Sequence, residues 1–299
     1  MDCTAVVRSF NRTVTQRIGV LEDNYLSRRR PIGQARLMWE IGCDGAQLRT
    51  LRTRLGLDSG YLSRLLRALE TDGLVVVDPD PDDQRVRMVR LTRAGRAELA
   101  ELDRRSDELV ATILAPLNDR QRHRLATAMA EVEKLLTASM VCVAVTDPRL
   151  PEAQHCLAAY AAELAERLES GFDPARTRPV DAADITAPRG LLLIARLRGE
   201  PVGCGALRLH DNRSAEIKRM WISPAARGLG LGRRLITELE THARDHGVSV
   251  LRLDTNHSLA EAIALYRSSG YLEVPRFNDE PYSDHWFEKV LDRQPVRRR

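Results

Sequence analysis

Apolar residues recur at helical spacing through most of the first 138 residues. Leu62, Leu65, Leu66 and Leu69 share one face of a helix that begins at Asp58 or Ser59 and ends before Gly73. The same spacing predicts further helices at 4–27, 34–42, 46–54, 93–115 and 119–138. Two β-rich runs in residues 75–92 flank a turn rich in Asp and Pro, which is typical of a β-hairpin. This part of the chain is therefore predicted to be mainly helical with one hairpin.

The pattern changes at Val141, where strands and helices begin to alternate. Strands are predicted at 141–146, 190–197, 201–209, 215–222, 248–254, 271–275 and 284–291, and helices at 150–169, 231–246 and 260–268. Short turns, one of them at 211–212, join the strands between 190 and 222, so these strands form an antiparallel meander. We predict two domains, residues 1–138 and 141–292, and a basic tail at 293–299 that we expect to be disordered.

Composition narrows the class of protein. With 299 residues, 43% hydrophobic and 29% charged, the chain resembles an ordinary soluble protein. No apolar run approaches the ~20 residues of a membrane span and no signal-peptide core is present, so we expect a cytoplasmic protein with no membrane partner. The five cysteines are scattered without a CxxC pair, which predicts buried free thiols and no metal site.

Basic side chains gather around the helix predicted to begin at Asp58 or Ser59. Residues 47–67 contain five arginines and a single acidic residue, Asp58. A helix that enters the major groove of DNA needs small polar and cationic side chains on its N-terminal face. The candidates in this helix are Ser59, Tyr61, Ser63, Arg64 and Arg67, and in the hairpin Arg85 and Arg87, which are placed to enter the minor groove. Double-stranded DNA is therefore a predicted partner.

Two stretches in this half resemble the MarR family of regulators. They are LRTRLGLDSGYLSRLLRALETDGLV, which is similar to the family's helix-turn-helix, and DDQRVRMVRLT, which is similar to its wing. The resemblance implies a mainly-α winged helix-turn-helix domain. It also implies a homodimer held by the first and the last two helices, with Asp83 bracing the wing and Arg85 contacting DNA. The alternative is a winged helix used only for dimerisation or for contact with another protein.

A glycine-rich loop, SPAARGLGLGRRL, lies at residues 223–235. A Walker loop would end in Gly-Lys-Ser/Thr, and a Rossmann loop would need a third glycine where Leu235 stands, so neither nucleotide loop fits. The pattern that fits is R-x-x-G-x-G, with Arg227, Gly230 and Gly232. Backbone N–H groups free of side chains can converge there on a pyrophosphate at a helix N-terminus. The alternative is that the glycines only cap the helix.

This loop resembles the acetyl-CoA loop of the GNAT acetyltransferases. The strand AEIKRMWISP precedes it, and AIALYRSSGY, with Tyr266, Gly270 and Tyr271, is similar to the family's second signature. The resemblance implies an α+β GNAT fold with a mixed, largely antiparallel sheet, and acetyl-CoA as co-substrate without a metal. It places contacts to the cofactor at Met220, Trp221, Ile222, Arg227, Gly228, Leu229, Gly230, Leu231, Gly232, Arg233 and Asn256.

The resemblance also implies catalytic roles. Transfer to an amine needs a proton acceptor for the amine and a proton donor for the leaving thiolate. By the resemblance, Tyr266 is the donor and Glu216 a general base; alternatively, Tyr266 is core packing and Glu216 pairs with Lys218 or Arg219. Two functions stay open. One is a bifunctional DNA-binding regulator and N-acetyltransferase acting directly on a small amine or a protein amine. The other is a regulator whose GNAT-like domain only senses acetyl-CoA.

Overall fold

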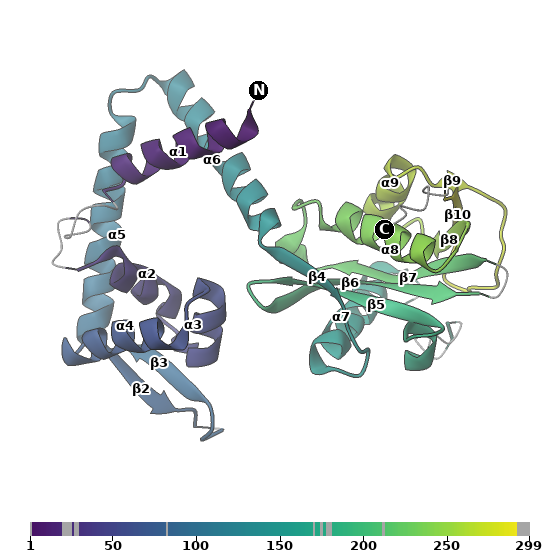
Figure 1. Cartoon of the computed structure of the whole chain (residues 1–299), viewed down its shortest axis with the longest axis horizontal. Coiled ribbons are helices and arrows are strands. Elements are labelled where there is room, and N and C mark those ends of the chain that lie inside the picture. The colour runs from purple at the N-terminus through teal and green to yellow at the C-terminus, as the bar shows by residue number, and fades with distance from the viewer. Residues whose placement is uncertain are drawn as a thin grey trace, which may run out of the picture. The chain divides into compact units, whose positions relative to one another are not determined.

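The computed structural model divides the chain into two compact units, Met1–Glu131 and Val132–Arg299 (Figure 1). The described residues are 2–19, 26, 30–81, 83–169, 171–173, 176–177, 181–210 and 213–291. The turn at 211–212, the tail at 293–299 and most of 20–29 lie outside them. The division falls within one helix, Asp119–Ser139, whereas the sequence places the boundary at 138–141, which stays a prediction.

The N-terminal unit packs its helices against a small sheet. Its helices are α1 (Cys3–Arg17), α2 (Ile32–Ile41), α3 (Leu48–Leu55), α4 (Ser59–Thr71), α5 (Arg93–Leu114) and the first part of α6 (Asp119–Ser139). Its strands, β1 (Ala46–Gln47), β2 (Val75–Pro79) and β3 (Arg87–Leu91), form a sheet in the order β1-β3-β2. The leucine face of α4 is buried in a core shared with α2 and β3, which fixes its opposite face toward solvent.

Local caps explain why α4 begins where it does. Asp58 accepts a hydrogen bond from the backbone N–H of Tyr61 at 2.8 Å, and so satisfies one of the N–H groups left open at a helix start. The preceding helix, α3, ends at Gly56, whose φ of 62° is the left-handed conformation that glycine adopts without strain. The tight connection between α3 and α4 therefore follows from local sequence.

Two predicted elements of this unit differ in the structure. The helix predicted at 4–27 ends at Arg17. The helix predicted at 46–54 begins at Leu48, because Ala46 and Gln47 pair with Val89 and Met88 of β3 instead. Gly45 permits this pairing, since an added Cβ would lie 2.8 Å from the carbonyl oxygen of Val89. A pairing partner more than 40 residues away overrides the local helical spacing.

The C-terminal unit is built on a seven-stranded sheet. Its helices are α7 (Pro151–Arg167), α8 (Leu231–Asp245) and α9 (Ala260–Ser268), with short 3-10 turns at Ala182–Ile185 and Pro224–Ala226. Its strands are β4 (Val141–Val145), β5 (Gly190–Leu197), β6 (Glu200–Leu209), β7 (Ser214–Ile222), β8 (Val250–Thr255), β9 (Leu272–Glu273) and β10 (His285–Val290). The order is β4-β5-β6-β7-β8-β10-β9, and among the described residues only β7 and β8 pair in parallel.

Both faces of this sheet are covered. In β5, Leu191 and Leu193 pack in one cluster with α8, while Leu192 and Ile194 pack in another with α7. The ribbon accordingly shows α7 on one side of the sheet and α8 and α9 on the other (Figure 1). Burial on both faces explains why β5 reads as a continuous apolar run rather than an alternating one.

Two irregularities in β7 shape the centre of the unit. Strands β7 and β8 are paired only from Ser214–Glu216 to Val250–Arg252, and beyond this they separate. The register with β6 also shifts, because Cys204 pairs with Trp221 and Ala206 with Lys218. Arg219, inside this bulge, has a φ of 57°. The parting of two adjacent parallel strands opens space between α7 and α9.

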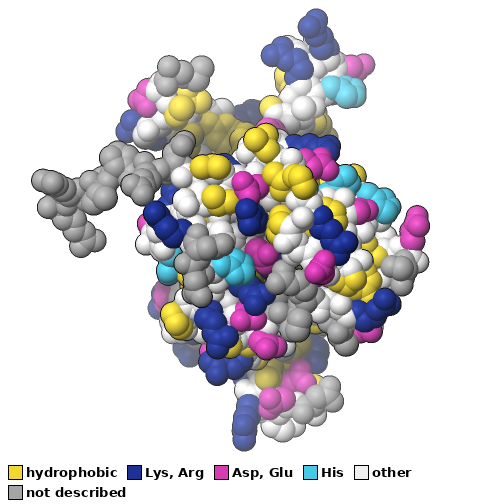
Figure 2. Space-filling view, turned by 90° about the vertical axis from the view of Figure 1, so that its right-hand side faces the viewer, with side chains coloured by type: hydrophobic (Ala, Val, Ile, Leu, Met, Phe, Trp, Pro, Cys, Tyr) yellow, Lys and Arg dark blue, Asp and Glu magenta, His cyan; other side chains and the backbone are white. Residues whose placement is uncertain are grey.

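On the face of the C-terminal unit presented in Figure 2, Lys and Arg side chains are interspersed with Asp and Glu among hydrophobic and other side chains. A surface on which the two signs of charge alternate does not create a strong electrostatic potential of one sign. None of the described helices is both long and apolar enough to cross a bilayer.

Candidate active site and DNA-binding surface

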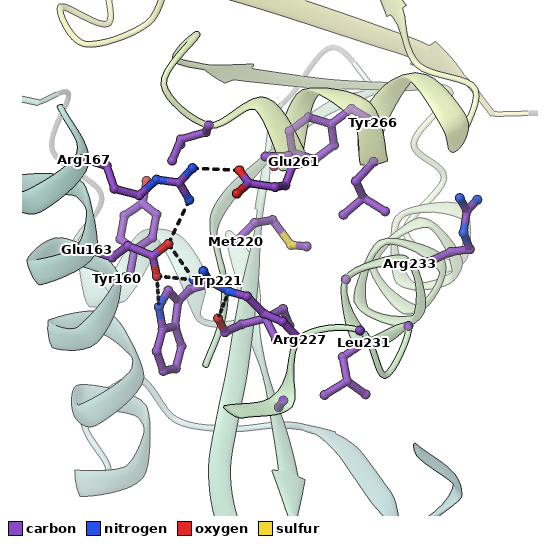
Figure 3. A pocket seen from close by; sticks show the side chains of 18 of the residues that line it. Tyr160, Glu163, Arg167, Met220, Trp221, Arg227, Leu231, Arg233, Glu261 and Tyr266 are labelled. Carbon is purple, nitrogen blue, oxygen red and sulfur yellow. Dashed lines mark hydrogen bonds and ion pairs between the residues drawn. The ribbon is translucent and has the colours of Figure 1, made fainter. Parts of the chain in front are cut away.

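A cavity of about 520 Å³ lies beside the glycine loop, where β7 and β8 have separated (Figure 3). Helices α7, α8 and α9 contribute its walls. It brings together most of the predicted cofactor residues, namely Met220, Trp221, Ile222, Arg227, Gly228, Gly230, Leu231, Gly232 and Arg233, and it also contains Tyr266. The two family signatures, far apart in sequence, therefore line one cavity.

The three glycines of the loop have different physical roles. Gly228 and Gly230 have φ values of 79° and 76°, in the left-handed region. Gly230 is the N-cap of α8, and an added Cβ would meet nothing within 4 Å, so open space lies in front of it. An added Cβ on Gly232 would instead lie 2.8 Å from Leu265, which shows close packing between α8 and α9. The first N–H groups of α8 are left without helical partners and attract an anion.

A network of charges closes the opposite wall of the cavity. Arg227 pairs with Glu163 of α7 at 2.5 Å and donates to the carbonyl oxygen of Ile222. The same carboxylate accepts from Trp221 Nε1 at 3.0 Å and pairs with Arg167 at 3.1 Å (Figure 3). Arg227 is therefore held at the mouth of the cavity by α7, and its guanidinium already has a carboxylate partner.

Glu163 and Arg167 were not among the residues selected from the sequence. Their spacing of four places both on one face of α7, and an i,i+4 ion pair is an ordinary feature of a solvated helix. Their contacts with Arg227 and with Glu261 of α9 span 64 and 94 residues of sequence. No local pattern identifies such partners.

A second, smaller cavity of about 90 Å³ adjoins the first, with Tyr160, Met220 and Tyr266 in the walls of both. The Tyr266 side chain is 5% exposed, and its ring meets those of Tyr271 and Phe287 at centroid distances of 6.2 and 6.0 Å. Burial raises the pKa of Tyr266 above its ordinary value. A phenol is protonated at neutral pH with or without this shift, so the place of Tyr266 in the walls of both cavities, and not its pKa, marks it as the candidate donor.

An ion pair lies in the second cavity. Lys218 of β7 pairs with Asp254 of β8, which also accepts from Ser283 Oγ at 2.7 Å and Asn278 Nδ2 at 2.9 Å. Burial raises the pKa of Asp254, but the neighbouring Lys218 charge and these hydrogen bonds outweigh it and hold the pKa below its ordinary value. Asp254 was also missed from the sequence, because its partner lies on another strand.

Three predicted residues lie elsewhere. Glu216 is buried, lines neither of these two cavities, and has Oε2 3.8 Å from Lys218 Nζ, so its catalytic role stays a prediction. Asn256 lies in the second cavity, donates to the carbonyl oxygen of Tyr282 and accepts from the N–H of Ser258. Leu229 packs against the core instead of lining the larger cavity.

The predicted DNA-binding side chains share the solvent face of α4 and the hairpin. All are exposed: Ser59, Tyr61, Ser63, Arg64, Arg67, Arg85 and Arg87. The Arg64 guanidinium lies 5.6 Å from the centre of the Tyr61 ring. Asp83 Oδ1 accepts from the backbone N–H of Arg85 at 2.9 Å, which braces the hairpin tip.

The two hairpin arginines differ in the contacts that their guanidinium groups make. Arg87 donates to the carbonyl oxygen of Val77 at 3.1 Å, across the hairpin. The guanidinium of Arg85 makes no hydrogen bond or ion pair within the part of the chain that the structure describes, and the residue is exposed in the turn. Arg85 is therefore the hairpin cation best placed to reach a phosphate.

Comparisons with known proteins agree with this geometry. Residues 158–271 match the Acetyltransferase (GNAT) family model. The chain is similar to an IAA acetyltransferase of Azospirillum brasilense, 39% identical over 34% of this chain and 67% of that protein. It is also 35% identical to the N-alpha-acetyltransferase RimI of Mycobacterium tuberculosis, over 41% of this chain and 74% of that one. The chain belongs to the GNAT acetyltransferase family.

The N-terminal unit carries a MarR-family domain, since residues 32–86 match the MarR family model. This part of the chain is similar to the Uncharacterized HTH-type transcriptional regulator YdgJ of Bacillus subtilis, 28% identical over 27% of this chain and 50% of that protein. The fold class predicted from the sequence, a winged helix-turn-helix followed by a GNAT fold, is confirmed. Each relative matches only one part of the chain, so the activity of the whole protein is a separate question.

Proposed function

We propose that this chain is a bifunctional protein, in which the MarR-family domain binds double-stranded DNA and the GNAT domain transfers an acetyl group from acetyl-CoA to an amine. The observation that carries the catalytic half is the position of Tyr266. Its buried, protonated side chain lies where the cavity beside the glycine loop meets the smaller cavity. A proton donor is needed at the junction of a cofactor site and an acceptor site.

In the larger cavity, the glycine loop and α8 would hold the pyrophosphate of CoA. Open space in front of Gly230 and the N–H groups of the first turn of α8 suit a diphosphate. Arg233 adds a positive charge nearby, and it donates to the carbonyl oxygen and Oγ of Ser268 at 3.0 and 2.8 Å rather than to a carboxylate. Main-chain groups of Met220 and Ile222, beyond the point where β8 leaves β7, would pair with the pantetheine amides as an added strand.

The transfer itself would be direct. The acceptor nitrogen forms a bond to the acetyl carbon as the carbon–sulfur bond breaks. The leaving thiolate takes a proton from Tyr266 Oη, and the amine loses a proton to a base, for which Glu216, acting through water, is the sequence candidate. The buried thiol of Cys204 donates to the carbonyl oxygen of Arg219 at 3.1 Å, so the proposal gives it no nucleophilic role.

The smaller cavity favours a small amine as acceptor. Its volume of about 90 Å³ would hold roughly six to nine water molecules, if each needs about 10–15 Å³. The names of the relatives differ in the acceptor that they indicate. The proposal of a small amine therefore depends on the volume of the cavity and not on the names of the relatives.

The MarR-family domain would act as a homodimer on DNA. Helices α1 and α6 have no buried residues within one chain, and they expose apolar side chains at Val6, Val7, Phe10, Leu135 and Leu136. A second copy would cover these faces, and its α4 would read a second half-site about one helical turn away. The exposed polar and basic face of α4 supports contact with DNA.

Thiol release tests the catalytic half. The full chain is incubated with acetyl-CoA and a panel of small amines, and free CoA is measured with a thiol reagent. Amine-dependent release supports an enzyme. Tight binding of acetyl-CoA without release for any amine would instead indicate a sensor.

Selection from random DNA duplexes tests the regulatory half. Enrichment of an inverted repeat with half-sites about one helical turn apart supports a dimeric regulator. Failure to enrich any sequence would favour a winged helix that serves only for dimerisation or protein contact.

A further inference from the structure

Arg219 occupies the bulge at the centre of the proposed active site. Between the pairs Cys204–Trp221 and Ala206–Lys218, β7 carries two residues opposite one on β6. Arg219 is one of these two residues and has a left-handed φ of 57°. Its carbonyl oxygen accepts a hydrogen bond from Cys204 Sγ. A left-handed conformation at a residue with a long side chain is uncommon, and it re-aims that side chain relative to a regular strand.

Within the part of the chain that the structure describes, the guanidinium of Arg219 has no acidic partner. It lies 5.6 Å from the centre of the Tyr160 ring, in the walls of the 90 Å³ cavity and of a third cavity of about 220 Å³. No carboxylate among the described residues lies within 4 Å of it, whereas Lys218 beside it is paired with Asp254. A cation on a cavity wall without a counter-charge is available to an anionic group of a ligand.

The other cations around these cavities are either paired with a carboxylate or placed away from the two smaller cavities. Arg167 is paired with Glu163 and Glu261, and Arg227 is paired with Glu163. Arg233, for which the described residues likewise include no carboxylate partner, lies by the glycine loop in the larger cavity. Within the described lining of the two smaller cavities, Arg219 is thus the cation left for an acceptor.

An apolar and aromatic wall adjoins Arg219. The ring of Phe172 meets that of Tyr160 at a centroid distance of 6.5 Å and that of Tyr282 at 5.1 Å. Tyr160, Phe172 and Arg219 belong to the walls of both smaller cavities, so the two cavities adjoin at these residues. Leu157 and Ile185 lie in the wall of the 220 Å³ cavity, which suits an apolar group.

We propose that Arg219 binds a carboxylate of the acceptor, and that the acceptor is therefore an amino acid with an apolar or aromatic side chain rather than a simple amine. This inference rests on the proposed acetyl transfer, because it names the substrate class of the same site. Arg219 lies next to Met220, which faces both the larger cavity and the 90 Å³ cavity. A carboxylate held at Arg219 thus brings a neighbouring amine toward the acetyl end of the cofactor, while the side chain enters the 220 Å³ cavity.

Matched acceptors test the carboxylate directly. L-leucine is compared with isoamylamine and L-phenylalanine with phenethylamine, each pair differing by one carboxylate. Thiol release by the full chain at saturating acetyl-CoA gives kcat and KM. We expect kcat/KM of the wild type to favour each amino acid by at least ~10²-fold, since an unmatched charge in a binding site discriminates strongly.

Two variants locate the effect. Arg219→Gln removes the charge, and we expect it to raise KM for both amino acids at least ~10-fold and to lower the ratio of kcat/KM for each amino acid to that for its matched amine at least ~10-fold. Arg198→Gln is the matched control, because Arg198 also has a left-handed φ, of 52°, but lies exposed in the turn between β5 and β6. Its kinetics and its affinity for CoA should match those of the wild type.

Calorimetric titration of the same four compounds into the chain saturated with CoA separates this inference from the proposed activity. Binding of the amino acids that depends on Arg219, without thiol release, would support the carboxylate site and count against acetyl transfer. Equal binding or turnover of the two members of each pair by the wild type would overturn the inference. An equal effect of Arg219→Gln on amino acids and amines would overturn it as well.

Discussion

Replacing Gly230 by aspartate should weaken the binding of CoA through charge alone. Gly230 has a left-handed φ of 76° at the N-cap of α8, and an added side chain would enter open space in the cavity. Asp and Asn both tolerate this conformation and have nearly the same shape. Gly230→Asn is therefore the matched control, and the difference between the two variants measures the effect of one negative charge on the bound diphosphate.

Coulomb's law sets the size of the effect. Two unit charges about 5 Å apart repel by roughly 1 kcal/mol in water and roughly 3 kcal/mol at an effective dielectric constant of about 20. Gly230→Asp should thus bind CoA about 5- to 150-fold more weakly than Gly230→Asn. The difference should shrink as salt is added, because the site is open to solvent.

Isothermal titration of CoA into the full chain measures both affinities. Gly247→Asp is a second control, because Gly247 has a φ of 73° and open space in front of it but does not line the larger cavity. Equal melting temperatures would show that the variants fold. Equal affinity of Gly230→Asp and Gly230→Asn for CoA would refute the assignment of the glycine loop to the pyrophosphate.

Four further results are expected. Tyr266→Phe should lower kcat by ~10²-fold while CoA affinity persists; turnover near that of the wild type, with chemistry rate-limiting, would exclude the proton-donor role. Arg64→Ala should cost about 1–3 kcal/mol of DNA binding and relax specificity at one position. Arg85→Ala should weaken binding to all sequences and lower the salt slope of a DNA titration, and an unchanged slope would argue against a phosphate contact. Leu135→Glu with Leu136→Glu should shift sedimentation toward monomers, whereas an unchanged mass would place the dimer interface elsewhere.

Local sequence was sufficient for much of the fold. The leucine spacing of α4, the Asp58 cap and the turn at Gly56 depend on neighbours within a few residues, so they can be identified without a structure. The short strand at Ala46–Gln47 could not be, because it depends on pairing with Val89 and Met88.

The candidate site also has features that local sequence predicts and features that it does not. The glycine loop and Tyr266 have distinctive local patterns, and the structure brings them to one cavity. The Glu163 contacts with Arg227 and Trp221, and the pair of Lys218 with Asp254, join residues 36 to 64 positions apart. The bulge that re-aims Arg219 likewise arises from strand register. These features follow from the tertiary fold and not from any local pattern.

The most direct test of the account is mass-spectrometric detection of the acetylated product made by the full chain, with Tyr266→Phe measured alongside at equal occupancy by acetyl-CoA. The account predicts that many molecules of acetylated amine form per molecule of wild-type protein, and that the variant binds acetyl-CoA equally but forms product ~10²-fold more slowly. Acetyl-CoA bound by the wild type, with no acetylated product from any amine or amino acid offered, would contradict the account.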